Sequence, residues 1–120
     1  MIGQLRSVVV DCPDPAELAS FYEKLLGGER LAGGDDPDWV VVVANGTRLA
    51  FQRAPEYVPP VYPDPHGSQQ FHLDVLVEDV EMAESQVLAL GAKLISRDNP
   101  DTFRVYTDPV GHTFCLVWLS

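Results

Sequence analysis

Two pairs of polar side chains with the chemistry of acid–base catalysis or ligand binding lie on two apolar stretches of the sequence. His72 and Asp74 are separated by one residue, and Ser7 and Asp11 lie together in the other stretch. Residues an even number of positions apart in an extended strand project from the same face. A histidine beside a carboxylate can act as a general base or can anchor a polar group of a ligand. We therefore predict a catalytic role for the first pair and a ligand-binding role for the second.

The stretch that carries His72 has the pattern of a strand followed by a helix. Apolar and polar residues alternate from Phe71 to Val77, and a period of two is typical of a strand with one apolar face. Asp79 is predicted to open a helix whose apolar positions step by three and four residues, and Gly91 to close it. Residues 92–96 are predicted to form the next strand.

The beginning of the chain repeats this plan. Val8 and Val10 alternate with Ser7, Val9 and Asp11, and Asp14 followed by Pro15 is typical of a helix N-terminus. Gly27 is predicted to end that helix. The chain therefore contains one strand–helix–strand unit written twice, and such repeats indicate a duplicated architecture.

Further strands complete each half. Trp39–Ala44 is rich in valine, and Asn45-Gly46 is a strong hairpin signal, so Thr47–Arg53 is predicted to pair back antiparallel. In the second half we expect strands at Phe103–Thr107 and His112–Leu119. The predicted fold class is α+β: two βαβββ modules, each a four-stranded, mostly antiparallel sheet with one covering helix, whose uncovered faces form a concave cleft.

We expect one domain over residues 1–120, with module 1 at about 5–53 and module 2 at about 69–119, because a chain of this length can bury a single core. The segment 54–68 between them holds five of the ten prolines and is predicted to be an extended link.

Two tyrosines of this link, Tyr57 and Tyr62, have two interpretations. They either pack on the outside of the domain or line a lid over a pocket, since ordered loops often carry binding residues. Within the strand 103–107 we expect Arg104 and Tyr106 on opposite faces, so that only one of them reaches the cleft.

Composition excludes several classes of partner. The formal net charge of −10 argues against nucleic acid and anionic membrane surfaces. The longest apolar run, Trp39–Ala44, is far shorter than the roughly 20 residues that span a bilayer, and the N-terminus lacks the apolar core of a secretion signal. Cys12 and Cys115 show no CxxC spacing. We therefore expect a cytoplasmic protein with two free thiols.

The doubled order of elements, together with three short motifs, resembles the vicinal oxygen chelate superfamily. The motifs are the runs Asp14–Gly27 and Asp79–Ala92 and the closing turn Asp108–His112. This superfamily includes glyoxalase I, the bleomycin-resistance proteins and the extradiol dioxygenases, and the similarity extends from Ser7 to Leu119. The resemblance implies the glyoxalase/bleomycin resistance/dioxygenase fold and a homodimer. The strand that carries Trp39 is a candidate contributor to the dimer, and core burial is the alternative for that residue.

The resemblance also implies four metal ligands, usually His and Glu, on the first and last strands of each module. Carried across by position, these ligands fall on Ser7 and Gln52, and on His72 and Cys115; only His72 is of the usual type. Divalent ions favour imidazole nitrogen and carboxylate oxygen, so we expect no cofactor.

Two metal sites remain as alternatives. A divalent ion, if held, is expected at His72 with Gln52 and Cys115. A zinc site made of His72, Cys115 and one carboxylate, either Asp74 or Asp11, is the other arrangement.

Two functions remain open, and the chain is not assigned as an enzyme from its sequence. The first is a small-molecule-binding protein of unknown ligand without the usual divalent metal. The second is a glyoxalase-related lyase or isomerase that acts on a small oxygen-rich metabolite, with His72 as base or metal ligand. A purely structural interaction module is disfavoured because it leaves the polar groups on the inner faces unexplained. The predicted ligand-binding residues are Ser7, Asp11, Gln52, Cys115, Tyr57 and Tyr62.

Overall fold

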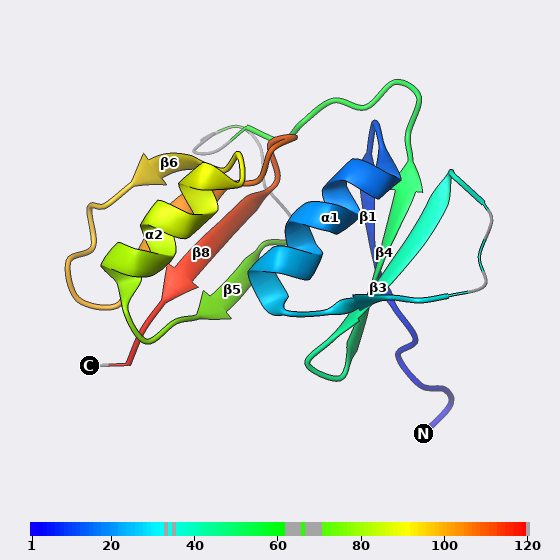
Figure 1. The fold of residues 1–120 in the computed structure, drawn as a ribbon, viewed down its shortest axis with the longest axis horizontal. Helices are drawn as coiled ribbons and strands as arrows, with labels where there is room; N and C mark the ends of the chain where they lie inside the picture. The colour runs from blue at the N-terminus through cyan, green and yellow to red at the C-terminus, as the bar shows by residue number, and fades with distance from the viewer. Residues whose placement is uncertain (33, 35, 62–65, 67–70, 120) are drawn as a thin grey trace. The chain divides into compact units, whose positions relative to one another are not determined.

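Each half of the chain folds as a strand, a helix and three further strands in a computed structural model, which describes residues 1–32, 34, 36–61, 66 and 71–119. The chain divides into two units, Met1–Tyr57 and Val58–Ser120. Figure 1 shows the same order of elements in both units. The predicted α+β fold of two βαβββ modules is confirmed.

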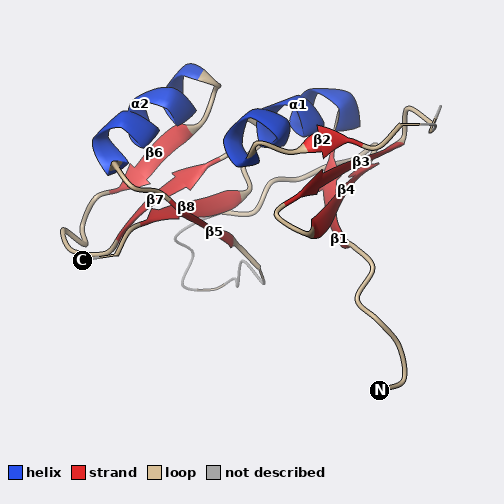
Figure 2. Cartoon of the chain, turned by 60° about the horizontal axis from the view of Figure 1, so that its bottom comes forward, coloured by secondary structure: helices blue, strands red, loops and turns tan. Residues whose placement is uncertain are grey.

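The first unit has one helix and a four-stranded mixed sheet in the order β1-β4-β3-β2. Strand β1 runs parallel to β4, and the other neighbours are antiparallel. Figure 2 shows α1 along one face of this sheet. The elements are β1 (Val8–Cys12), α1 (Pro15–Leu26), β2 (Glu29–Arg30), β3 (Trp39–Ala44) and β4 (Thr47–Arg53).

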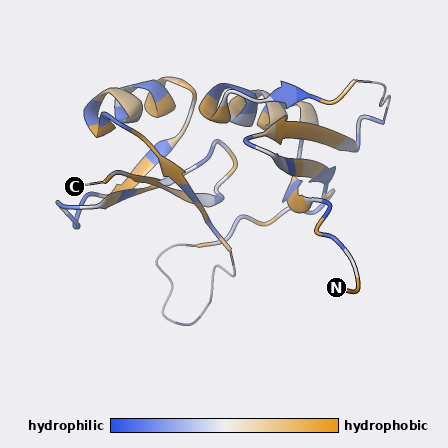
Figure 3. Cartoon of the chain, turned by 90° about the horizontal axis from the view of Figure 1, so that it is seen from below, coloured by the Kyte–Doolittle hydropathy of each residue, from blue (hydrophilic) through white to orange (hydrophobic). Residues whose placement is uncertain are grey.

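Helix α1 begins and ends at the predicted residues. The Asp14 side chain accepts hydrogen bonds from the backbone N–H groups of the first turn, and Gly27 closes the helix with a φ of 70°. The buried face of α1 packs on β4, where Tyr22 stacks on Phe51 with ring centroids 5.4 Å apart. Strand β3 is hydrophobic along most of its length (Figure 3), because its sequence is WVVVVA. Its consecutive valines place apolar side chains on both faces of the sheet.

Two local features of this sheet depend on glycine. Asn45 and Gly46 both have positive φ, 55° and 76°, as a tight hairpin turn between β3 and β4 requires. Gly28 lies so close to β3 that an added Cβ would be 2.7 Å from the Ala44 Cβ and 2.9 Å from the Val43 carbonyl oxygen. Position 28 therefore tolerates only hydrogen as a side chain without local displacement.

The second unit repeats the plan with a mixed sheet in the order β5-β8-β7-β6. Strand β5 is parallel to β8, and the other neighbours are antiparallel. Helix α2 lies along one face of its own sheet in Figures 1 and 2. The elements are β5 (Leu73–Leu76), α2 (Val80–Ala89), β6 (Lys93–Ser96), β7 (Phe103–Thr107) and β8 (Thr113–Val117).

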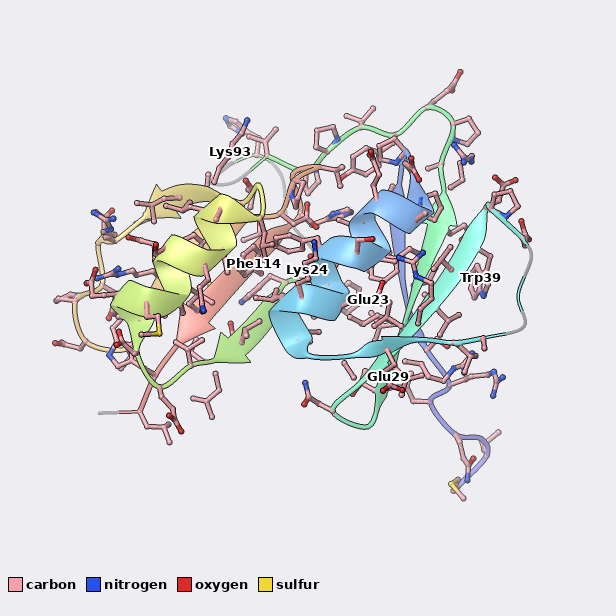
Figure 4. All side chains as sticks on the ribbon, in the orientation of Figure 1. Glu23, Lys24, Glu29, Trp39, Lys93 and Phe114 are labelled. Carbon is pink, nitrogen blue, oxygen red and sulfur yellow. The ribbon has the colours of Figure 1, made fainter. Side chains whose placement is uncertain are left out.

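The face of the sheet beneath α2 carries both apolar and charged residues. Phe114, labelled in Figure 4, stacks on Tyr106 with ring centroids 5.5 Å apart. Tyr106 and Arg104 both reach acidic groups of α2. The prediction that these two residues lie on opposite faces is therefore wrong, because residues two apart in a strand share a face.

Strand β5 is shorter than the alternating pattern that predicted it. Its ladder with β8 begins at the pair Leu73–Phe114. Phe71 lies before this ladder and is 86% exposed, so its predicted place on the apolar face is wrong. The alternation of apolar and polar residues therefore starts two residues before the first hydrogen-bonded pair of the strand.

The turn before β8 is organised by one buried carboxylate. Asp108 accepts hydrogen bonds from the backbone N–H groups of Val110 and His112, each at 3.0 Å, and its second oxygen lies 2.7 Å from Nδ1 of His112. His112 is therefore part of a turn rather than of the predicted last strand. Over the described residues, neither helix has the length and apolar character required to cross a bilayer.

Candidate functional site

Three side chains capable of proton transfer or metal binding meet on the sheet of the second unit. Asp74 and Cys115 are directly paired in the parallel ladder between β5 and β8, and His72 lies two residues before Asp74. The Nε2 atom of His72 is 3.4 Å from Oδ1 of Asp74. One ligand atom from each of the three residues lies within 4.8 Å of the others. We call these three residues the His–Asp–Cys cluster.

The His–Asp–Cys cluster projects from the face of the sheet opposite α2. The flanking residues of the ladder, Leu73 and Phe114, are paired with each other, and Phe114 stacks on Tyr106 beneath the helix. Side chains alternate between faces along a strand, so the cluster lies on the face that no helix of this unit covers. The side chains of His72 and Asp74 are 40% and 60% exposed, whereas Cys115 is only 7% exposed.

Thr113 adds a buried polar atom to this face. It lies two residues before Cys115 on β8 and is 5% exposed. Within the part of the chain that the structure describes, its Oγ1 has no hydrogen-bond partner. An unpaired buried hydroxyl costs free energy unless something bound supplies the partner. Sequence reasoning missed Thr113, although its even spacing from Cys115 was a usable signal.

The surroundings of Cys115 disfavour its thiolate. Burial, followed by the negative charge of Asp74 and a hydrogen bond to that carboxylate, raises the pKa of Cys115 to about 11. A thiol with this pKa is protonated at neutral pH and is a poor nucleophile. Cys115 therefore cannot act as a nucleophile in the way that an activated cysteine does, unless a bound cation displaces its proton.

The predicted site residues of the first unit share a face of their own sheet. Asp11 is paired with Gln52, and Gln52 is paired in turn with Trp39 on β3. Because Phe51 lies beneath α1, its neighbour Gln52 belongs to the opposite, uncovered face. Ser7 Oγ accepts a hydrogen bond of 3.2 Å from Nε of Arg48.

A groove of about 340 Å³ is lined by residues of β2, β3 and β4 and of the connection between β2 and β3. Trp39 and Arg48 line it together with Leu31 and Val41. Trp39, labelled in Figure 4, is partly exposed at the beginning of β3. An indole and a guanidinium in one groove can contact a planar or anionic group.

The two predicted lid tyrosines have different outcomes. Tyr57 lies in a turn, where its backbone N–H donates to the carbonyl oxygen of Ala54 at 3.1 Å. Tyr62 lies outside the described residues. Neither result tests a role in ligand binding.

A second polar group, which the sequence did not reveal, lies beneath α2. Glu84 is buried and accepts hydrogen bonds from Arg97 and, at 2.8 Å, from the hydroxyl of Tyr106. Nη1 of Arg104 lies 3.3 Å from the same carboxylate, and Arg104 also pairs with Glu81 at the beginning of the helix. The hydrogen bond from Arg97 lowers the pKa of Glu84, and burial opposes this shift. These contacts tie α2 to its sheet rather than form a site.

The four positions that the superfamily resemblance implies as metal ligands do not suit a hard divalent ion. The Ser7 hydroxyl oxygen already accepts a hydrogen bond from the guanidinium of Arg48. The fixed positive charge of that guanidinium repels a cation. Gln52 offers only a neutral carbonyl oxygen, and Cys115 is a protonated thiol. His72 alone retains the expected donor type.

Comparison with solved structures shows the same architecture at low sequence identity. A glyoxalase/bleomycin resistance protein/dioxygenase family enzyme from Burkholderia phytofirmans PsJN superposes with a TM-score of 0.79 at 16% identity, covering 98% of this chain and 100% of that one. The fosfomycin resistance protein FosX from Listeria monocytogenes gives 0.74 at 13% identity, covering 100% and 94%. A glyoxalase family protein from Enterococcus faecalis gives 0.67 at 20% identity, covering 97% and 98%.

Sequence comparison identifies the family. No curated protein sequence matches the chain. The family model described as "Glyoxalase-like domain" matches residues 7–117, which is nearly the whole chain. This match to the family model agrees with the duplicated βαβββ order and the two mixed sheets. The chain therefore belongs to the glyoxalase-like domain family.

Proposed function

We propose that this protein binds a small, oxygen-rich polar molecule on the uncovered face of the second sheet. The observation that carries the proposal is the His–Asp–Cys cluster with the orphaned hydroxyl of Thr113 on the same face. Binding sites place a few convergent polar groups on an otherwise apolar surface, and Val117, two residues after Cys115 on β8 and partly exposed, supplies apolar surface beside the cluster. His72 anchors the molecule, and Asp74 favours a ligand that donates hydrogen bonds or carries positive charge.

The first unit is proposed to carry a separate polar surface of its own. Asp11 and Gln52 are adjacent on its uncovered face, and Trp39 extends the same row. Arg48 and Ser7 form a further polar pair on this face. We also propose that the protein binds no hard divalent ion at the four positions implied by its superfamily, because the residues there are poor donors for such an ion.

A thermal-shift screen of the purified protein tests this function. The panel contains polyols, hydroxy acids, catechols, small amines and fosfomycin, which is included because FosX shares the fold. Ligand binding stabilises the folded state in proportion to occupancy. We expect at least one class of compound to raise the unfolding temperature in a concentration-dependent manner.

The variant His72→Ala makes the screen specific for the site. It is expected to weaken binding of the stabilising compound about tenfold or more, because a lost hydrogen bond to a charged group contributes about 1.5–3 kcal/mol. Its own unfolding temperature should change little, since the side chain is part-exposed. Met82→Ala, at an exposed position of α2, is the matched control and should bind like the wild type. Unchanged binding by His72→Ala would place the site elsewhere.

Catalysis is the second candidate function. The 3.4 Å separation of His72 Nε2 and Asp74 Oδ1 favours it, because a carboxylate orients an imidazole that serves as a general base. In that case the protein is a lyase or isomerase that removes a proton from carbon next to a carbonyl group. Incubation of the hydroxy acids and their keto counterparts in deuterated water, followed by NMR, would show enzyme-dependent deuterium incorporation that His72→Ala lacks.

Two further properties are proposed alongside this function. We propose a cytoplasmic location, which the two free cysteines support, because reducing compartments keep thiols unpaired. We also propose a homodimer, on the basis of the superfamily resemblance. Sedimentation velocity should give one species of about twice the 13.2 kDa chain mass; a single species at the chain mass would contradict the dimer.

A further inference from the structure

We propose that His72, Asp74 and Cys115 form a site for one thiophilic divalent cation, of the class of Zn²⁺ and Co²⁺, that is complete within the second unit. The inference goes beyond the proposed function, because it requires no small molecule and no residue of the first unit. It also differs from the superfamily pattern in using Asp74, which does not lie at a position that the resemblance implies.

The three donors have the right chemistry for this class of ion. Imidazole nitrogen, carboxylate oxygen and thiolate sulfur are the three ligand types that Zn²⁺ takes from proteins. Three protein ligands with one further open position are typical of sites in which the ion also binds water or a substrate. A thiolate donor disfavours hard ions such as Mg²⁺ and Mn²⁺, which prefer oxygen.

The geometry needs only small side-chain movements. Tetrahedral coordination with bonds of about 2.0–2.3 Å places ligand atoms about 3.3–3.6 Å from one another. The pair His72 Nε2 and Asp74 Oδ1 is already at 3.4 Å. All three donor atoms lie within 4.8 Å of one another. They therefore need to move only about 1 Å closer together to reach the spacing of ligand atoms around a bound ion. His72 and Asp74 are part-exposed and can rotate, whereas Cys115 is held by the buried strand β8.

Thr113 gives an independent indication that a polar species binds here. Its buried Oγ1, unpaired among the residues described, lies on the face of β8 from which Cys115 projects. Polar atoms of this kind commonly find their partner in a bound water or ion. The net charge of −10 also favours the approach of a cation over that of an anion.

Titration of the metal-free, untagged 120-residue chain with Co²⁺ tests the proposal directly. Thiolate bound to Co²⁺ gives an intense near-ultraviolet charge-transfer absorption that oxygen and nitrogen ligands do not give. We expect this band to saturate at one Co²⁺ per chain and to be abolished by one equivalent of Zn²⁺. A tenfold excess of Mg²⁺ or Mn²⁺ should leave it unchanged.

Matched variants identify the donors. Cys115→Ser should remove the charge-transfer band and weaken Zn²⁺ binding by about a hundredfold or more, at least the effect of losing an outer-shell partner. Cys12→Ala is the control, since its thiol contacts the carbonyl oxygen of Gln52 in the first unit, and it should keep the band. His72→Gln and Asp74→Asn should each weaken binding while the band persists at saturation. Circular dichroism confirms that each variant is folded.

Several outcomes would overturn the proposal. A Co²⁺ spectrum without thiolate character, a band that survives in Cys115→Ser, or equal affinity for Mn²⁺ and Zn²⁺ would each do so. The proposed function is distinguished by repeating the small-molecule screen in the presence of a chelator. If a panel compound stabilises the protein in chelator and the separate Co²⁺ titration gives no thiolate band, the small-molecule site is retained and the metal site is rejected. If the titration gives the band and no compound stabilises the protein in chelator, the metal site is retained and the small-molecule site is rejected.

Discussion

The thiol of Cys115 is held in its protonated form by burial and by the carboxylate of Asp74, which together raise its pKa to about 11. Alkylation proceeds through the thiolate, so the metal-free protein in a Cys12→Ala background should react slowly at pH 8. Asp74→Asn removes the two contributions of that carboxylate but not the burial. The alkylation rate at pH 8, measured by mass spectrometry, should then rise several-fold. An unchanged or lower rate in Asp74→Asn would contradict the assigned contact.

The orphaned hydroxyl of Thr113 gives a second prediction at the scale of one residue. Thr113→Val replaces a buried, unpaired oxygen with a methyl group of similar shape. Since an unpaired buried polar group costs about 1–3 kcal/mol, the free energy of unfolding in urea should stay the same or increase by about 1 kcal/mol. Binding of Zn²⁺ or of the stabilising compound should weaken in the same variant. A loss of stability would instead show that the hydroxyl has a partner in the free protein.

Helix α2 depends on a buried charge as well as on apolar packing. Glu84 joins the helix to Tyr106 on β7 and to Arg97, which directly follows β6. Glu84→Gln leaves buried donors without their charged acceptor and should cost about 3 kcal/mol of unfolding free energy at pH 7. Glu81→Gln is the control, because Glu81 is mostly exposed and its ion pair contributes at most about 1 kcal/mol.

The pH dependence of this contribution has a defined sign. The pKa of Glu84 is lowered in the folded protein, chiefly by the hydrogen bond from Arg97. The stabilisation is therefore fully present above the unfolded value of about 4.3 and is lost as the pH falls through the lower, folded pKa. The difference in unfolding free energy between wild type and Glu84→Gln should narrow below about pH 4. A difference that stays constant down to pH 3 would show that the ionised carboxylate contributes little.

The approach of α1 to β3 is limited by Gly28. An added Cβ at this position would lie 2.7–2.9 Å from side-chain and backbone atoms of β3. Gly28→Ala should lower the free energy of unfolding by about 1–3 kcal/mol through overpacking. Gly3→Ala has no atom within 4 Å of the added Cβ and is the matched control. Equal stability of the two variants would contradict the close contact.

At the scale of the whole molecule, the architecture could be predicted from local patterns because each of them has a local cause. Asp14 and Asp79 cap the helices through hydrogen bonds within the next three residues. The Asn45-Gly46 turn requires positive φ at both residues, which this pair accepts readily. The repeated strand–helix pattern in the sequence indicates two modules without information on contacts between strands.

The parts that could not be predicted depend on partners distant in the sequence. Glu84 is a charged residue in a helix, and only Arg97 and Tyr106, 13 and 22 positions later, explain its burial. Likewise, alternation predicted that His72 and Asp74 share a face. It could not predict that the parallel pairing of β5 with β8 brings Cys115 beside Asp74, because that register is set by the whole sheet.

The proposed ligand-binding surface is the face of the second sheet that α2 does not cover. A two-dimensional ¹⁵N–¹H NMR titration with the most stabilising compound of the thermal-shift panel tests it most directly. We expect progressive shifts for the backbone amides of His72, Asp74, Thr113 and Cys115, with little change at Met82 and Leu88 on the exposed surface of α2. Shifts confined to α2, or spread evenly over the second unit without a maximum at these four residues, would contradict it.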